Sequence, residues 1–243
     1  DAENELPRDP VGPVLQAMVE MRREGPAAAR EHFQRALQMQ PDSAPIEFNI
    51  AQTYRLERDY DKARAAFAAI LAKRPGDLDS AITLADIELQ QGRTKEGIEL
   101  LKRASATSRA ARFRLVRAYL ATGDPRGART IAREMEAMSQ RDLDVLALLG
   151  DVQIANREFQ TAIQTWQRVV NASNGAPPAL VGLARAHDAA GGSVEAARTL
   201  QEAIEANIAK TVLPRLFFEH VAKRNLLAQG IAFARDLEQT RPD

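Results

Sequence analysis

A repeat of 34 residues constrains the fold of this chain more than any other feature. The stretch YDKARAAFAAILAKRP, residues 60–75, places Ala63, Phe67 and Ile70 at helical spacing ahead of Pro75. The same pattern stands 34 positions earlier, in the stretch AAREHFQRALQMQP that ends at Pro41. An isolated amphipathic helix needs no small residue at one fixed place, so Ala63 predicts a second backbone close by.

The pattern occurs seven times along the chain. Its period is 34 residues except for one interval of 31, between Gly97 and Ala128. The small residue and the residue four positions later are Ala29 and Phe33, Ala63 and Phe67, Gly97 and Leu101, Ala128 and Ala132, Ala162 and Trp166, Ala196 and Leu200, and Gly230 and Ala234. A fixed period of this length indicates a solenoid built from repeated supersecondary units.

Each of these segments follows another apolar segment of helical period, so two helices per repeat are predicted. Gly92, Gly123 and Gly191 stand between the paired segments, where a glycine with positive φ suits the end of the first helix. Good helix formers are abundant, while valine and isoleucine appear singly rather than in strand-like runs. The predicted fold class is therefore all-α.

The pattern resembles the tetratricopeptide repeat, a family of 34-residue helical hairpins, from about residue 10 to 242. The resemblance implies a right-handed superhelical solenoid, with Ala63 and its equivalents where the helices of a hairpin cross. The residue four positions later then packs between neighbouring repeats. We expect a short extension at 1–9 and a single solenoid at 10–243, with repeats at 10–43, 44–77, 78–108, 109–142, 143–176, 177–210 and 211–243.

The last predicted helix lacks a polar capping helix after it. Leu226, Ile231 and Phe233 have no following segment to cover them. We expect the chain to be a segment of a longer protein, and the alternative is a natural end with an atypical cap. The uncovered helix also offers a surface for self-association.

No constellation for catalysis, metal binding or cofactor binding is evident. His32, His187 and His220 lie far apart, and none has a second ligand at helical spacing. The chain has no cysteine, no phosphate-binding loop and no apolar run approaching the roughly 20 residues that span a bilayer. Trp166 occupies the large position of its repeat, which predicts a core residue. We therefore expect a protein that is not an enzyme and needs no metal or cofactor.

The resemblance implies that the first helices of the repeats line a concave surface. Along them an apolar row runs beside a polar row, which alternates in sign from Asp86 onward, through Arg117, Asp151 and Arg185. Arginines here can reach carboxylates of both neighbouring repeats and hold the array in register, or form a recognition track for an extended peptide or a partner helix. The predicted partner-binding residues are Phe48, Gln52, Arg55, Ile82, Asp86, Phe113, Arg114, Arg117, Asp151, Arg185 and Asp188.

Basic residues are concentrated between Arg93 and Arg133, although the chain has 33 basic and 33 acidic residues. This stretch can steer an acidic partner, favour solubility or bind an anionic polymer. Nucleic acid is disfavoured because exposed aromatics are not interleaved with the basic residues. The carboxylate clamp by which some relatives bind chaperone tails is also disfavoured, since only Asn49 matches a clamp position.

The excess of arginine over lysine and the abundance of alanine resemble proteins encoded by GC-rich bacterial genomes. In such bacteria long arrays of this family occur in envelope machinery. Our first hypothesis is a periplasmic scaffold of exopolysaccharide secretion and biofilm formation, which recruits a polysaccharide-modifying enzyme or links components of the two membranes. The alternative is a cytoplasmic adaptor for pili, secretion or transcription.

Overall fold

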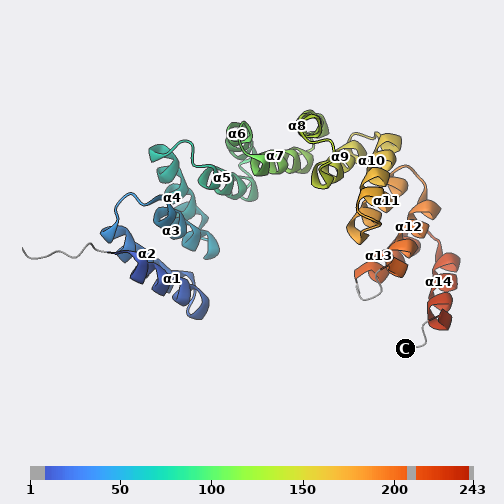
Figure 1. Ribbon diagram of the computed structural model, residues 1–243, viewed down its shortest axis with the longest axis horizontal. Coiled ribbons are helices and arrows are strands. Elements are labelled where there is room, and N and C mark those ends of the chain that lie inside the picture. Colours follow the sequence, from blue (N-terminus) through green and yellow to red (C-terminus); the bar gives the residue numbers. More distant parts are fainter. Residues whose placement is uncertain (1–8, 207–211, 241–243) are drawn as a thin grey trace, which may run out of the picture. The chain divides into compact units, whose positions relative to one another are not determined.

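The computed structural model describes residues 9–206 and 212–240, and all regular structure in these ranges is helical (Figure 1). The all-α prediction is confirmed. The fourteen helices are α1 (Val11–Arg23), α2 (Pro26–Met39), α3 (Ala44–Leu56), α4 (Tyr60–Lys73), α5 (Leu78–Gln90), α6 (Thr94–Ser105), α7 (Arg109–Ala121), α8 (Pro125–Met138), α9 (Leu143–Ala155), α10 (Phe159–Ala172), α11 (Pro177–Ala189), α12 (Ser193–Ala206), α13 (Val212–Lys223) and α14 (Leu227–Thr240).

The chain forms two compact units, Asp1–Ala118 (unit 1) and Tyr119–Asp243 (unit 2), which divide within α7. Each predicted repeat contains two of the helices, and odd-numbered helices are the first helices of their repeats. The assignment of both units to a single domain stays a prediction.

The turns inside the hairpins all contain a residue of positive φ. Gly92, Gly123 and Gly191 have φ of 76°, 76° and 90°, as predicted. The corresponding turns of three other hairpins have Arg58, Arg157 and Asn225, with φ between 57° and 61°. Left-handed backbone costs a non-glycine residue roughly 1–2 kcal/mol. The close packing of the two helices therefore imposes this turn even where the sequence has no glycine.

The core of unit 1 shows why the small residue recurs. Ala63 of α4 is fully buried, and Phe67 and Ile70 complete the same face of that helix. These three residues cluster with Ala51 of α3, within the hairpin, and with residues of α5 in the next repeat, Leu84 and Ile87. At the equivalent Gly97, a methyl group would lie 3.0 Å from the carbonyl oxygen of Ala85 on α5. The roles that the repeat pattern predicts for these positions are confirmed here.

Trp166 organises the corresponding core of unit 2. Its side chain is 4% exposed and packs between α9 and α11, as predicted for a core residue. Space for the large indole is made by two glycines, Gly150 on α9 and Gly182 on α11. A Cβ atom at Gly150 would stand 2.5 Å from the indole Nε1, and one at Gly182 would collide with the six-membered ring. Both glycines are therefore sites of close helix approach.

The apolar side chains at the last helix are more buried than the sequence indicates. Phe233 of α14 is buried, and its ring lies 5.0 Å from that of Phe217 in an edge-to-face arrangement. Leu226 is half-buried against the same core. The expectation that these two side chains lie uncovered is wrong, because Phe233 packs onto α13 of its own repeat and Leu226, in the turn before α14, contacts the same core. Ile231 is 53% exposed, as expected, and Leu227 is exposed as well.

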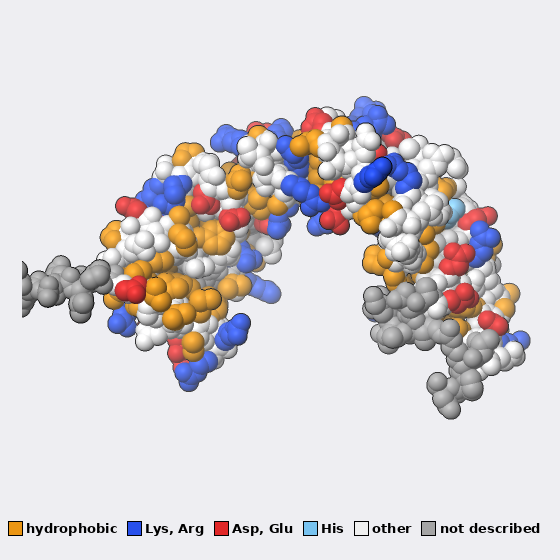
Figure 2. All heavy atoms as spheres, in the orientation of Figure 1, with side chains coloured by type: hydrophobic (Ala, Val, Ile, Leu, Met, Phe, Trp, Pro, Cys, Tyr) orange, Lys and Arg blue, Asp and Glu red, His pale blue; other side chains and the backbone are white. Residues whose placement is uncertain are grey.

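Apolar side chains are also exposed on the first helix. Val11, Leu15, Met18 and Val19 of α1 are each more than half exposed. Figure 2 shows apolar side chains gathered over the region of α1 to α4, with lysine and arginine side chains at its margin. This apolar face was not singled out from the sequence.

Candidate partner-binding face of the first helices

The predicted partner-binding residues of unit 1 lie on three first helices: Phe48, Gln52 and Arg55 on α3, Ile82 and Asp86 on α5, and Phe113, Arg114 and Arg117 on α7. We call these eight residues the unit-1 face. Two of its apolar members contribute to the core. Ile82 is only 8% exposed, and the half-buried ring of Phe48 meets Phe67 edge to face at 5.5 Å. The surface available to a partner is thus mostly polar.

Asp86 and Arg114 form the main ion pair of the unit-1 face. Arg114 Nη1 lies 2.5 Å from Asp86 Oδ2, so α7 is tied to α5 of the preceding repeat. In the alternating row Arg117 is the arginine next to Asp86, but the carboxylate pairs with Arg114 instead, one turn earlier on α7. Arg117 is exposed. The neighbouring Arg55 donates from Nε to Gln52 Oε1 at 2.5 Å within α3.

The carboxylate of Asp86 is incompletely compensated. Burial raises the pKa of Asp86 above its ordinary value, and the charge and hydrogen bond of Arg114, with the charge of Arg55, offset this only in part. A half-buried carboxylate of this kind can accept a further hydrogen bond or a further positive charge. Close by on α7, the guanidinium of Arg109 stands 4.6 Å from the centroid of the Phe113 ring.

Unit 2 contributes Asp151 on α9 and Arg185 and Asp188 on α11, which we call the unit-2 face. Arg185 Nη2 lies 2.8 Å from Asp151 Oδ1, so the pair expected from the alternating charges is present. The Arg185 guanidinium also lies 5.7 Å from the centroid of the Trp166 ring. Glu219 on α13 pairs with Arg215 of its own helix at 2.7 Å.

Asp188 connects α11 to α13 rather than standing free for a ligand. Its Oδ2 accepts from Arg224 Nη2 at 2.6 Å, and its Oδ1 lies 3.8 Å from His220 Nδ1. Burial alone would raise the pKa of Asp188, but the Arg224 hydrogen bond and charge, His220 and Ser193 lower it below its ordinary value of 3.8. The structure therefore favours the ionised carboxylate.

We expect Asp188→Asn to destabilise unit 2 at neutral pH, and the difference from the unaltered protein to shrink in acid. Because folding lowers this pKa, the stabilisation is complete above pH 3.8 and is lost as the pH falls through the lowered value. Urea midpoints of both proteins at pH 7, 5 and 3.5 measure the difference, with exposed Asp61→Asn in unit 1 as control. A difference that is constant over this range would contradict the assignment.

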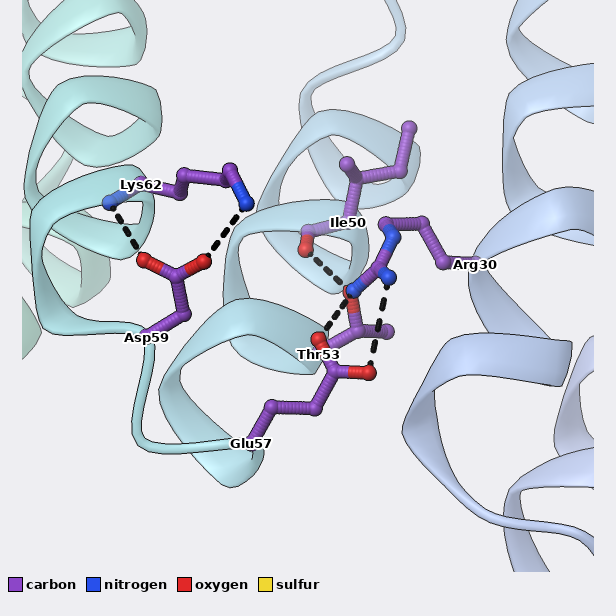
Figure 3. A network of polar contacts seen from close by, with 6 residues as sticks. All are labelled: Arg30, Ile50, Thr53, Glu57, Asp59 and Lys62. Atoms are coloured by element: carbon purple, nitrogen blue, oxygen red, sulfur yellow. Dashed lines mark hydrogen bonds and ion pairs between the residues drawn. The ribbon is translucent and has the colours of Figure 1, made fainter.

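A polar network between repeats one and two was not predicted. Arg30 of α2 donates from Nη1 to Thr53 Oγ1 at 3.3 Å and to Glu57 Oε2 at 2.5 Å (Figure 3). Thr53 lies on α3, and Glu57 is the residue that follows its last turn. The Arg30 guanidinium also covers the Tyr54 ring, 4.3 Å from its centroid. The hydrogen bond to Glu57 raises the pKa of Arg30. The partners lie 23 and 27 residues apart in sequence, which no short motif reveals.

Several side chains of the basic stretch between Arg93 and Arg133 are already paired. Arg93 with Glu88, Lys102 with Glu99, Arg114 with Asp86 and Arg129 with Glu158 form ion pairs. These carboxylates reduce the positive charge that an anionic polymer would meet. The stretch also divides between the two units, so its basic residues belong to two separate surfaces.

The described residues contain no cluster of three or more histidine, aspartate or glutamate side chains that could hold a metal ion. Within the same ranges, no helix has the length and apolar character needed to cross a membrane.

Comparisons with known proteins agree with the helical repeats. Models of the tetratricopeptide repeat match residues 14–78, 54–109 and 88–152, and together these matches extend over more than half of the chain. A comparison with curated proteins finds no match.

Solved structures of the same repeat type are similar in fold. A tetratricopeptide repeat protein from Parabacteroides merdae superposes with a TM-score of 0.73 at 9% identity, covering 96% of this chain and 93% of that one. PilF of Pseudomonas aeruginosa gives a TM-score of 0.62 at 16% identity, covering 89% and 99%. YrrB, described as having an unusual peptide-binding site, gives 0.55 at 14% identity, covering 76% and 96%. The chain belongs to the tetratricopeptide repeat family.

Proposed function

We propose that this chain is a non-catalytic scaffold that binds an extended segment of a partner protein on the first-helix faces of its two units. The tetratricopeptide repeat fold serves protein–protein interaction, which supports the proposal at the level of the family. The peptide-binding site of YrrB is a property of that protein and supplies a precedent within the fold.

The observation that carries the proposal is the Asp86–Arg114 pair on the unit-1 face. Both side chains are partly exposed, and the Asp86 carboxylate is left with part of its burial cost uncompensated. A partner can place a lysine or arginine beside Asp86 and an acidic or carbonyl group beside Arg114. These new contacts replace the Asp86–Arg114 pair at little cost in desolvation. The half-buried ring of Phe113 offers apolar contact beside the pair.

The cellular setting is proposed from composition. We place the scaffold in the periplasm of a bacterium, in an envelope or exopolysaccharide-secretion machine, with a polysaccharide-modifying enzyme or envelope component as partner. A cytoplasmic adaptor for pilus assembly, secretion or transcription is the alternative. Fractionation of the native cells with an antibody to this chain separates the two, since only the first proposal puts the chain in the periplasmic fraction.

We expect the double charge reversal Arg114→Glu/Arg117→Glu to remove the main partner from an affinity capture out of native extracts. The reversal replaces the partner of Asp86 with a carboxylate and adds a second negative charge one turn further along α7, which repels a partner that fits the present charges. The matched control is Arg35→Glu/Arg64→Glu, which reverses two exposed arginines on the second helices α2 and α4. Quantitative mass spectrometry of the captured proteins, with circular dichroism to confirm folding, measures the result.

Equal recovery of every captured protein by the folded Arg114→Glu/Arg117→Glu variant would overturn the proposed face and reduce the ion pairs to contacts that hold the repeats in register. Recovery of nucleic acid or anionic polysaccharide in place of a protein, with steep loss at raised salt, would favour binding through the basic stretch instead. Arg185→Glu against Arg198→Glu repeats the comparison for unit 2.

A further inference from the structure

A polar pocket of ≈ 560 Å³ opens on unit 2, and none of the unit-2 face residues lines it. It is lined by the C-terminal part of α8 and the following Gln140, by residues 161–168 of α10, and by Gln153 of α9. The volume falls within the range of about 300–1,000 Å³ that is usual for small-molecule sites. The pocket therefore has room for a ligand that the scaffold function does not require.

Gln153 is the feature that points to a ligand. Its side chain is 4% exposed, and its Oε1 has no hydrogen-bond partner among the described residues. Buried polar atoms are nearly always paired, so an orphaned acceptor that lines a pocket indicates a donor supplied from outside. The equivalent residue of the third repeat, Glu88, is also buried but pairs with Arg93. At this position of the repeat the acceptor is therefore unpaired in the fifth repeat and paired in the third.

Thr165 is the second buried polar residue of the pocket. It is 4% exposed and lies on α10. Two preceding repeats have Ile131 and Leu100 at the corresponding position, both apolar. The pocket is therefore polar where the two preceding repeats have aliphatic side chains, while the following repeat again has a buried threonine, Thr199.

The side chains that line the pocket carry an excess of positive charge. Arg133 and Arg168 both line it and are exposed, against one acidic residue, Glu136. Arg168 Nη1 lies 3.4 Å from Glu136 Oε1, and its Nη2 donates to the Gln140 carbonyl oxygen at 3.3 Å. Arg133 adds a positive charge that Glu136 does not balance.

We propose that this pocket binds a small hydroxylated carboxylate. Hydroxyl groups both donate and accept, so they satisfy the amide of Gln153 and the hydroxyl of Thr165 in whichever orientation these take. A carboxylate matches the guanidinium groups of Arg133 and Arg168. The lining has no aromatic side chain, which disfavours a flat aromatic ligand.

The test is a titration of the ¹⁵N-labelled chain with three probes, followed by two-dimensional NMR. D-glucuronate carries hydroxyls and a carboxylate, D-glucose only hydroxyls, and propionate only a carboxylate. We expect glucuronate to shift the Gln153 side-chain amide and the Thr165 backbone amide in a saturable way. The other two probes should bind at least about tenfold more weakly, a factor that corresponds to loss of one well-formed polar contact.

Single substitutions measure how much each lining side chain contributes to binding of the probes. Gln153→Leu removes the orphaned acceptor and should weaken glucuronate binding at least about tenfold. Arg133→Gln should weaken glucuronate but leave glucose binding unchanged. Gln167→Leu, an exposed position of α10 outside the pocket, is the matched control and should bind as the unaltered chain does. If Gln153→Leu does not fold, Thr165→Val replaces it, since valine keeps the shape and removes the hydroxyl.

The proposal is supported by saturable shifts at the Thr165 backbone amide that are lost in Gln153→Leu, or at the Gln153 side-chain amide that are lost in Thr165→Val, and that are kept in Gln167→Leu. Absence of saturable shifts with glucuronate, equal shifts with all three probes, or unchanged binding by the pocket variants would overturn it. The partner-capture experiment above does not depend on this outcome, because its variants on α7 and α11 lie outside the pocket lining.

Discussion

Trp166→Ala should lower the free energy of unfolding of unit 2 by about 3–5 kcal/mol, the range for removing a fully packed large aromatic side chain. The indole fills the space between α9 and α11, and Gly150 and Gly182 leave no side chain of their own to fill a cavity there. Collapse around the truncated residue is therefore restricted. Thermal and urea unfolding of the unaltered and substituted chains measure the loss.

The fit between Trp166 and its glycines makes this prediction specific. Gly150→Ala alone should also destabilise unit 2, by about 1–3 kcal/mol, because the new methyl group meets the indole Nε1. Phe67 and Ala51 occupy the equivalent positions of the second repeat. The double variant Trp166→Phe/Gly150→Ala copies that pair and should be more stable than Gly150→Ala alone.

A double-mutant cycle over these two positions tests the contact directly. The coupling should be favourable to the double variant and fall within roughly 0.5–3 kcal/mol, as found for residues in contact. Additive losses would contradict the packing described here, because they would mean that the indole and Gly150 do not meet.

The sequence predicted the helical hairpins because two signals agree at every repeat. The small residue at the crossing and the aliphatic or aromatic residue four positions later are each buried in the first six repeats, from Ala29 to Leu200. Such positions depend on local spacing, which a single sequence displays. The positive φ of Arg58 and Arg157 was not predicted, since arginine has no preference for that backbone and packing alone imposes it.

The polar contacts were predicted less well, for a physical reason. Long side chains reach several partners, so the choice between Arg114 and Arg117 for Asp86 depends on the angle between α5 and α7, which the repeat pattern does not encode. The Arg30 network and the orphaned Gln153 also depend on side-chain directions across repeats. Polar sites formed between helices thus require the structure, whereas the apolar core does not.

Phe67→Ala should be the most damaging single substitution in unit 1, with a loss of about 3–5 kcal/mol. The Phe67 side chain is fully buried between its own hairpin and α5, and it supports the ring of Phe48 on the unit-1 face. Leu56→Ala, at a residue of α3 that is 51% exposed, is the control and should change stability by no more than about 0.5 kcal/mol.

The loss should also be local, because each repeat of a solenoid contacts only its neighbours. Hydrogen exchange measured by mass spectrometry should show lost protection in α3, α4 and α5 of Phe67→Ala, with α9 to α11 of unit 2 unchanged. The same variant should weaken partner binding even where it stays folded, because Phe48 loses its support beside Gln52 and Arg55. Uniform loss of protection over both units would instead mean that the chain unfolds as one cooperative body, and partner binding would then fall with stability alone.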